Sequence, residues 1–88
     1  MTLERWQTIS RHDQLLHIGA ALMRAASLQK NPRLFRICLN EARALIDLSL
    51  QDHKWNVYKE MLSGFRGELE KFYSGERTDD ISVLYRAL

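Results

Sequence analysis

The chain has 88 residues, a length that suits one domain rather than two. Thirteen Lys and Arg against eleven Asp and Glu give a net charge of only +2, weaker than the concentrated positive charge typical of nucleic-acid-binding domains. A single cysteine excludes an intramolecular disulfide, and no apolar run approaches the roughly 18 residues needed to cross a membrane. We therefore expect one soluble, cytoplasmic domain over residues 1–88, without a membrane span.

The first part of the chain predicts either a short helix followed by a long one or a single continuous helix. Thr2 is a suitable cap for a helix over residues 3–9. Ser10, followed by Asp13 three residues later, resembles a capping box and predicts a longer helix over residues 11–29. The inward face of that helix is expected to hold apolar and small residues, namely Leu15, Ile18, Gly19, Leu22, Met23 and Ala26.

The next helix is expected to be the central one. Asn31 is a good cap and Pro32 is favoured at a first helical position, so the pair predicts a helix over residues 32–50. Its apolar residues spread over roughly 240° of a helical wheel, an arc that one neighbouring helix cannot cover. The remaining polar strip consists of Arg36, Asn40, Arg43 and Asp47, in which Arg43 and Asp47 are spaced to pair.

An aromatic stripe dominates the second half of the chain. Six residues recur at alternating spacings of three and four and predict one helix over residues 55–73, with Asp52 as its cap and Gly75 at its end. Gly64 and Gly67 lie off this stripe, where they mark either a bend, a close backbone approach or two tolerated exposed glycines. The stripe consists of Trp55, Tyr58, Leu62, Phe65, Leu69 and Phe72.

The last residues predict a short helix that docks on one face. Ile81, Leu84, Tyr85 and Leu88 recur at the spacing of one helical stripe. Together the elements predict an all-α fold, a small antiparallel helical bundle of three main helices with short terminal helices.

The apolar surplus predicts association with another protein chain. A monomer of 88 residues has a small interior, and apolar surface left over on such a bundle commonly forms a dimer interface. We therefore predict a non-enzymatic homodimer or regulatory adaptor, whose partner is a second copy or an unidentified protein, with the aromatic stripe as its candidate interface. No motif indicates a catalytic residue, a metal or a cofactor, and Cys38 is expected to be a buried, inert thiol.

A polar surface supports a second hypothesis. Asp13 and His17 are four residues apart and share a helix face with Arg24, so they are spaced to form a proton-transfer or phosphate site. This hypothesis makes the protein a small helical hydrolase or a histidine phosphotransfer protein centred on His17. The full candidate polar surface consists of Asp13, His17, Arg24, Arg36 and Arg43.

A third hypothesis is an RNA- or DNA-binding regulator. Its phosphate contacts would come from a basic ridge on the helix over residues 32–50 and its preceding turn. Acidic residues interrupt the ridge, and no aromatic residue is interleaved with it to stack on bases, so nucleic acid is a weaker candidate partner than protein. The ridge consists of Lys30, Arg33, Arg36 and Arg43.

Overall fold

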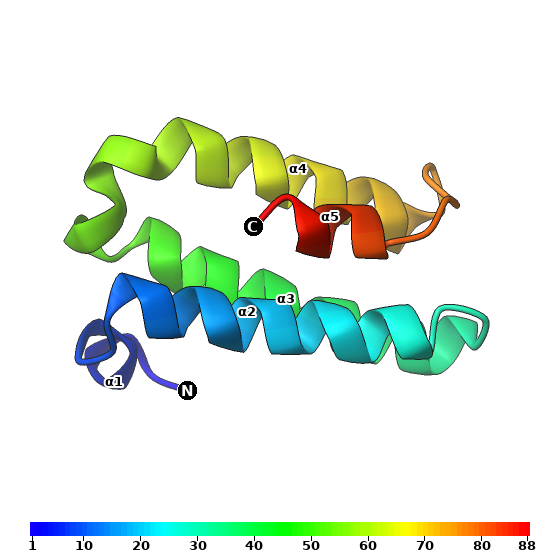
Figure 1. Ribbon diagram of the computed structural model, residues 1–88, viewed down its shortest axis with the longest axis horizontal. Helices are drawn as coiled ribbons and strands as arrows, with labels where there is room; N and C mark the ends of the chain where they lie inside the picture. The colour runs from blue at the N-terminus through cyan, green and yellow to red at the C-terminus, as the bar shows by residue number, and fades with distance from the viewer.

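A computed structural model describes residues 1–88 as helices joined by short turns, with no strand. Three long helices lie alongside one another, a short helix packs at one end, and the last helix lies between α2 and α4 (Figure 1). The predicted all-α bundle is therefore confirmed. Its elements are α1 (Leu3–Gln7), α2 (Arg11–Ser27), α3 (Pro32–Leu50), the 3₁₀ helix η1 (His53–Tyr58), α4 (Lys59–Ser74) and α5 (Ser82–Arg86).

Side-chain caps begin the first three helices where the sequence predicts them. The Thr2 hydroxyl accepts a hydrogen bond from the backbone N–H of Arg5, and the Ser10 hydroxyl accepts one from the N–H of Asp13. The Asn31 side chain accepts from the N–H of Leu34. Each cap satisfies one of the N–H groups that the first helical turn leaves without an intrahelical partner. These boundaries are set locally, which is why the sequence predicts them.

The predicted single helix over residues 55–73 is wrong at its beginning. Residues His53–Tyr58 form η1, and α4 begins only at Lys59. Asp52 caps this tighter turn, because its side chain accepts from the N–H of Lys54 and its carbonyl accepts from the N–H of Trp55. A 3₁₀ helix has three residues per turn, so Trp55 and Tyr58 lie one above the other, with ring centroids 5.9 Å apart.

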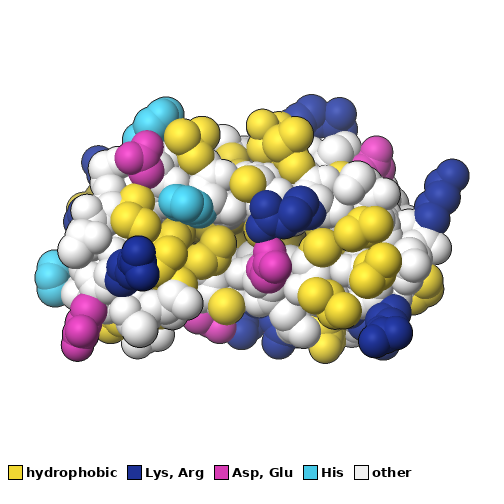
Figure 2. Space-filling model, turned by 90° about the horizontal axis from the view of Figure 1, so that it is seen from below, with side chains coloured by type: hydrophobic (Ala, Val, Ile, Leu, Met, Phe, Trp, Pro, Cys, Tyr) yellow, Lys and Arg dark blue, Asp and Glu magenta, His cyan; other side chains and the backbone are white.

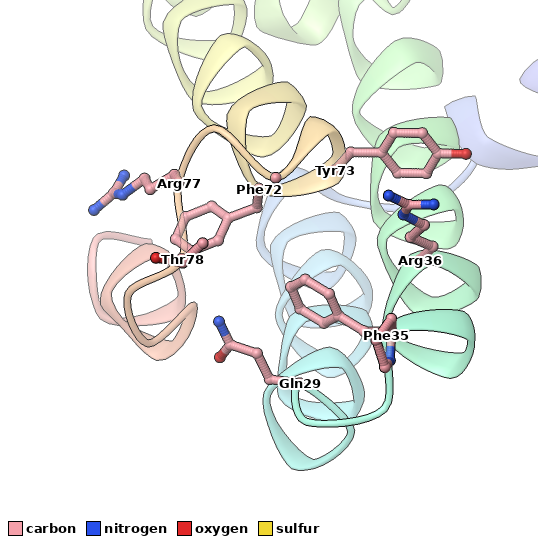
Figure 3. A pocket seen from close by; sticks show the side chains of 9 residues that line it. Gln29, Phe35, Arg36, Phe72, Tyr73, Arg77 and Thr78 are labelled. Carbon is pink, nitrogen blue, oxygen red and sulfur yellow. The ribbon is translucent and has the colours of Figure 1, made fainter.

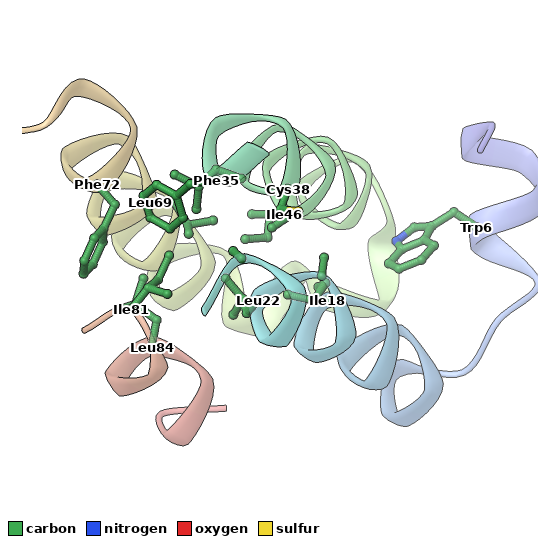
Figure 4. Close-up of a cluster of buried hydrophobic side chains, with 14 residues drawn as sticks. Trp6, Ile18, Leu22, Phe35, Cys38, Ile46, Leu69, Phe72, Ile81 and Leu84 are labelled. Atoms are coloured by element: carbon green, nitrogen blue, oxygen red, sulfur yellow. The ribbon is translucent and has the colours of Figure 1, made fainter. Parts of the chain in front are cut away.

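Helix α3 is central, as predicted, because it packs against α1, α2, η1 and α4. Cys38 is buried on it, also as predicted. Fourteen buried side chains form one cluster among α2, α3, α4 and α5 that reaches α1 through a tryptophan (Figure 4). The cluster consists of Trp6, Ile18, Ala21, Leu22, Ala25, Phe35, Cys38, Leu39, Ala42, Ile46, Leu69, Phe72, Ile81 and Leu84.

One expectation about the long helices is corrected, and the expected surplus of apolar surface on α3 is observed. Met23 was expected to point inward, but its side chain is 55% exposed. Leu34 and Ile37 on α3 are also exposed, so the neighbours of α3 leave part of its wide apolar arc in contact with solvent. In both cases the helix has more apolar residues around its circumference than the other helices of a small bundle can cover.

The glycines play different parts. Gly75 has φ +82°, and its N–H donates to the carbonyl of Phe72, so it is the predicted left-handed end of α4. A Cβ at Gly19 would lie 3.1 Å from the Tyr85 ring, which shows how closely α5 approaches α2. A Cβ at Gly64 or Gly67 would meet open space, so neither glycine marks a close approach of another backbone.

Candidate functional site

Helix α5 covers only part of the space between α2 and α4. It anchors there through Ile81 and Leu84, which are buried, and its C-terminal end points along α2 and α4 toward η1 (Figure 1). Beyond α5, a hollow of about 390 Å³ opens between α2, α4 and α5, and a second hollow of about 320 Å³ opens between α2, η1 and α4. A third hollow of about 510 Å³ lies between α2 and α5.

These three hollows form one continuous surface, which we call the apolar groove. Leu15 on α2 lines all three of them. Leu88, just after α5, lines two, and Met61 on α4 lines two. The groove is therefore centred on α2 and runs past α5, α4 and η1.

Most of the large apolar side chains that the fold leaves exposed line the apolar groove. Ten such side chains are exposed in the whole chain, and six of them belong to the groove. A concentration of this kind is unusual for a surface that contacts only water. The six are Leu16, Met23, Tyr58, Met61, Tyr85 and Leu88.

The two sides of the apolar groove carry opposite charge. The basic side chains and the histidine that line it are Arg11 and His12 on α2 and Arg86 on α5, whereas the acidic side chains are Glu60 and Glu68 on α4. The Arg11 guanidinium lies over the Tyr58 ring at 5.0 Å from the centroid and makes no ion pair. Glu60 also has no ion-pair partner, whereas Glu68 pairs with both Lys71 and Arg77.

The aromatic stripe divides between this groove and the core. Trp55, Leu62, Leu69 and Phe72 are buried within the chain, whereas Tyr58 is 40% exposed and Phe65 is half-buried. The first four residues of the stripe also line the groove, while Leu69 and Phe72 pack in the core cluster. The stripe as a whole is not one exposed surface, and only its first four residues line the groove.

A buried polar network lies next to the groove and was not predicted. Gln14 is fully buried, and its Nε2 donates to the carbonyl of Trp6 at 2.8 Å and to Oδ2 of Asp52 at 3.0 Å. Its Oε1 accepts from Nε1 of Trp55 at 2.6 Å. The only sequence signal is helical spacing, which places Gln14 four residues before buried Ile18 on the inward face of α2.

The network continues into α1, α3 and η1. Nε1 of Trp6 donates to the Ser49 hydroxyl at 3.0 Å, and the Lys54 ammonium lies 2.8 Å from Asp52 Oδ2 and donates to the Gln7 carbonyl at 2.6 Å. Burial raises the pKa of Asp52, but hydrogen bonds from Lys54 and Gln14 outweigh it and lower the pKa to about 2. No buried side-chain nitrogen or oxygen lacks a partner. The role of this network is therefore structural, because it holds α1, α2, α3 and η1 together.

The predicted site around His17 is not assembled. Asp13 and His17 form no hydrogen bond or ion pair, and the His17 ring instead lies 6.0 Å from the Trp6 ring. Arg24 pairs with Glu41 on α3 at 2.7 Å. No group of three or more His, Cys, Asp or Glu side chains is placed to hold a metal ion. On the face of α2 and α3 shown in Figure 2, hydrophobic side chains form separate groups with charged side chains and histidines among them.

Arg36 and Arg43 flank an aromatic ring rather than forming an open basic ridge. Their guanidinium carbons lie 5.7 Å and 4.3 Å from the centroid of the Tyr73 ring. Arg43 forms an ion pair with Glu70 on α4 at 2.7 Å. The expected pair of Arg43 with Asp47 is therefore wrong, because α4 supplies a nearer carboxylate, and Asp47 pairs with an arginine of α4 instead.

Another hollow, smaller than those of the groove, lies at the opposite end of the bundle. It has a volume of about 250 Å³, and its lining includes Gln29, Phe35, Phe72 and Tyr73 together with two cations, Arg36 and Arg77 (Figure 3). The Arg77 guanidinium is held by Asp79 and Glu68 and lies over the Phe72 ring. Its charge is thus already balanced within the chain.

The chain contains no helix whose length and apolar content would let it span a membrane. Comparisons with protein-family models, with curated proteins and with solved structures find no match.

Proposed function

We propose that the protein is a non-enzymatic interaction protein that binds another protein chain through the apolar groove, as a homodimer or a regulatory adaptor. The observation that carries this proposal is the concentration of exposed apolar side chains in one groove. Each square ångström of apolar surface removed from water contributes about 25 cal/mol, so a partner that covers these side chains gains binding energy that solvent does not supply.

The charged sides of the groove support recognition in addition to burial. Arg11 and Glu60 lie on opposite sides, and neither has a carboxylate or ammonium partner within the chain. Charged groups around an apolar centre orient a partner and select against chains of the wrong charge pattern. The proposal includes a cytoplasmic setting, which the lone buried thiol of Cys38 supports.

The other two hypotheses receive less support. The polar residues of the hydrolase or phosphotransfer hypothesis are not linked around His17, because Asp13 forms no hydrogen bond or ion pair with it and Arg24 pairs with Glu41. The basic ridge of the nucleic-acid hypothesis is broken where Glu70 neutralises Arg43. We therefore propose neither function.

The test compares two exposed apolar residues of similar kind. Met61 lies in the groove and is 59% exposed, whereas Ile37 lies on α3 outside it and is 48% exposed. Met61→Glu and Ile37→Glu should both keep the helical circular dichroism spectrum and the unfolding midpoint close to those of the wild type. Only Met61→Glu should lose the binding partners detected by chemical cross-linking in the host cell, whether these are second copies or other proteins.

The proposal would be contradicted if Met61→Glu retained every cross-linked partner of the wild type. It would equally fail if Ile37→Glu abolished the same partners, because the binding surface would then lie on α3. A difference between the two folded variants supports the groove as the binding surface.

A further inference from the structure

We infer that the chain that occupies the apolar groove is a second copy of this protein, related by a twofold axis that runs along the groove. This inference rests on the proposed function and specifies its partner. The groove runs between α2 and α4, and α5 lies within it. An axis along it places the α2 side of each copy against the α4 side of the other.

The distribution of charge carries this arrangement. The α2 side presents Arg11 and the α4 side presents Glu60, and neither residue forms an ion pair within the chain, whereas Glu68 on α4 already pairs with Lys71 and Arg77. An interface between two identical grooves is favourable only if the groove complements itself, and opposite charges on its two sides satisfy this condition when the axis exchanges the sides.

Arg11 and Glu60 are the residues best placed to meet across this interface. Arg11 is the first residue of α2 and Glu60 the second of α4, and both helices begin at the same end of the bundle (Figure 1). Because the twofold axis runs along the groove, this end of one copy lies against the same end of the other copy. Arg11 therefore faces the partner subunit's Glu60, and Glu60 faces the partner subunit's Arg11. Arg11 also lies at a helix N-terminus, where its own helix disfavours a cation, and a nearby carboxylate relieves that cost.

The apolar residues of the groove fit the same arrangement. Tyr85 and Leu88 are 41% and 42% exposed and lie at the end of α5 beside Leu15, which lines all three hollows. Two copies that meet groove to groove withdraw these side chains and the exposed Met61 from water together. Oligomerisation is also a common way for a chain of this size to add to a small core.

Charge reversal in two separate variants tests the inference. Arg11→Glu alone places like charges at both reciprocal contacts of a dimer, and so does Glu60→Arg alone. Each variant should therefore raise the dimer dissociation constant by about tenfold, measured by sedimentation equilibrium over a hundredfold concentration range. An equimolar mixture of the two variants forms a heterodimer in which both contacts are again of opposite sign. The mixture should recover the wild-type dissociation constant.

Arg33→Glu is the matched control, because Arg33 is an exposed arginine in the first turn of α3 and lies outside the groove. It should leave the dissociation constant unchanged. Arg11 and Glu60 are both exposed, so their variants should keep the helical spectrum of the wild type.

Three results would overturn the inference: a wild-type monomer throughout the concentration range, a dimer unaffected by either reversal, and a mixture no tighter than the separate variants. A wild-type monomer whose cross-linked partners depend on Met61 would leave the proposed function standing with a different protein as partner. Loss of the Met61 dependence would instead remove the proposed function itself.

Discussion

The buried polar network and the apolar groove are neighbouring regions that share α2 and η1. They differ in how many of their side chains find a partner within the chain. In the polar network, Gln14, Asp52 and the tryptophan indoles find all their hydrogen-bond partners within the chain. In the apolar groove, Met61 and Leu16 are each 59% exposed, and Arg11 has no carboxylate partner. One chain therefore satisfies every polar group of the network by itself, whereas it leaves large apolar side chains of the groove in contact with solvent.

Trp55 is where the two regions meet. Its indole N–H donates to Gln14 in the polar network, while its ring lines the hollow between α2, η1 and α4. Because the hydrogen bond fixes the ring, one wall of the groove is held in place by the network. Breaking the network should therefore affect folding, whereas altering the groove should affect association first.

The largest expected effect comes from Trp6, which joins α1 to the network and the core cluster. Its side chain is fully buried, and its Nε1 donates to Ser49. Trp6→Ala should lower the free energy of unfolding by about 3–5 kcal/mol, because it leaves a large cavity and removes a buried hydrogen bond. Urea denaturation followed by circular dichroism measures the change.

Val57→Ala is the control for this prediction, because Val57 is 89% exposed on η1 and lies in neither region. It should change the unfolding free energy by less than about 0.5 kcal/mol. A Trp6→Ala protein as stable as Val57→Ala would mean that α1 does not hold the network together.

A smaller effect is expected from the pH dependence of Asp52. Its pKa is about 2 in the folded protein against 3.8 for an unperturbed aspartate. A pKa lowered by folding stabilises the protein above pH 4, and this stabilisation is lost as pH falls from about 4 to 2. This difference between the two pKa values corresponds to about 2 kcal/mol in the free energy of unfolding.

Asp52→Asn should therefore reduce stability at pH 7 and flatten the decline of stability between pH 4 and 2. Thermal unfolding at each pH measures both changes. Asp79→Asn provides the comparison, because Asp79 is exposed and its pKa is lowered mainly by a hydrogen bond from Arg77. A wild-type acid transition that survives unchanged in Asp52→Asn would show that other carboxylates control it.

The smallest effect concerns the glycines of α4. Gly64 lines the groove in an ordinary helical conformation with open space at its Cβ position, whereas Gly75 ends the helix at φ +82°. Gly64→Ala should raise the unfolding free energy by up to about 1 kcal/mol, and Gly75→Ala should lower it by about 1 kcal/mol. Differential scanning calorimetry of the two variants should show melting temperatures that move in opposite directions, and a shift in the same direction would contradict this account.

The sequence by itself determined the elements that depend on near neighbours. The side chains of Thr2, Ser10 and Asn31 cap their helices by accepting a hydrogen bond from an N–H only three positions later. Gly75 ends α4 within its last turn. Apolar spacing along each helix likewise reports the face that turns inward. These signals lie within about one helical turn, so they predict the all-α fold and most helix boundaries.

Only the tertiary structure decided the features that join distant parts of the chain. Gln14 is buried because it meets Asp52 and Trp55, which lie 38 and 41 residues away in sequence. The same contacts accompany the 3₁₀ turn that interrupts the aromatic stripe, and packing of α4 on α3 gives Arg43 the carboxylate of Glu70 in place of its neighbour on α3. A polar side chain can be buried only where partners from other elements satisfy it, and those partners do not exist until the helices have packed.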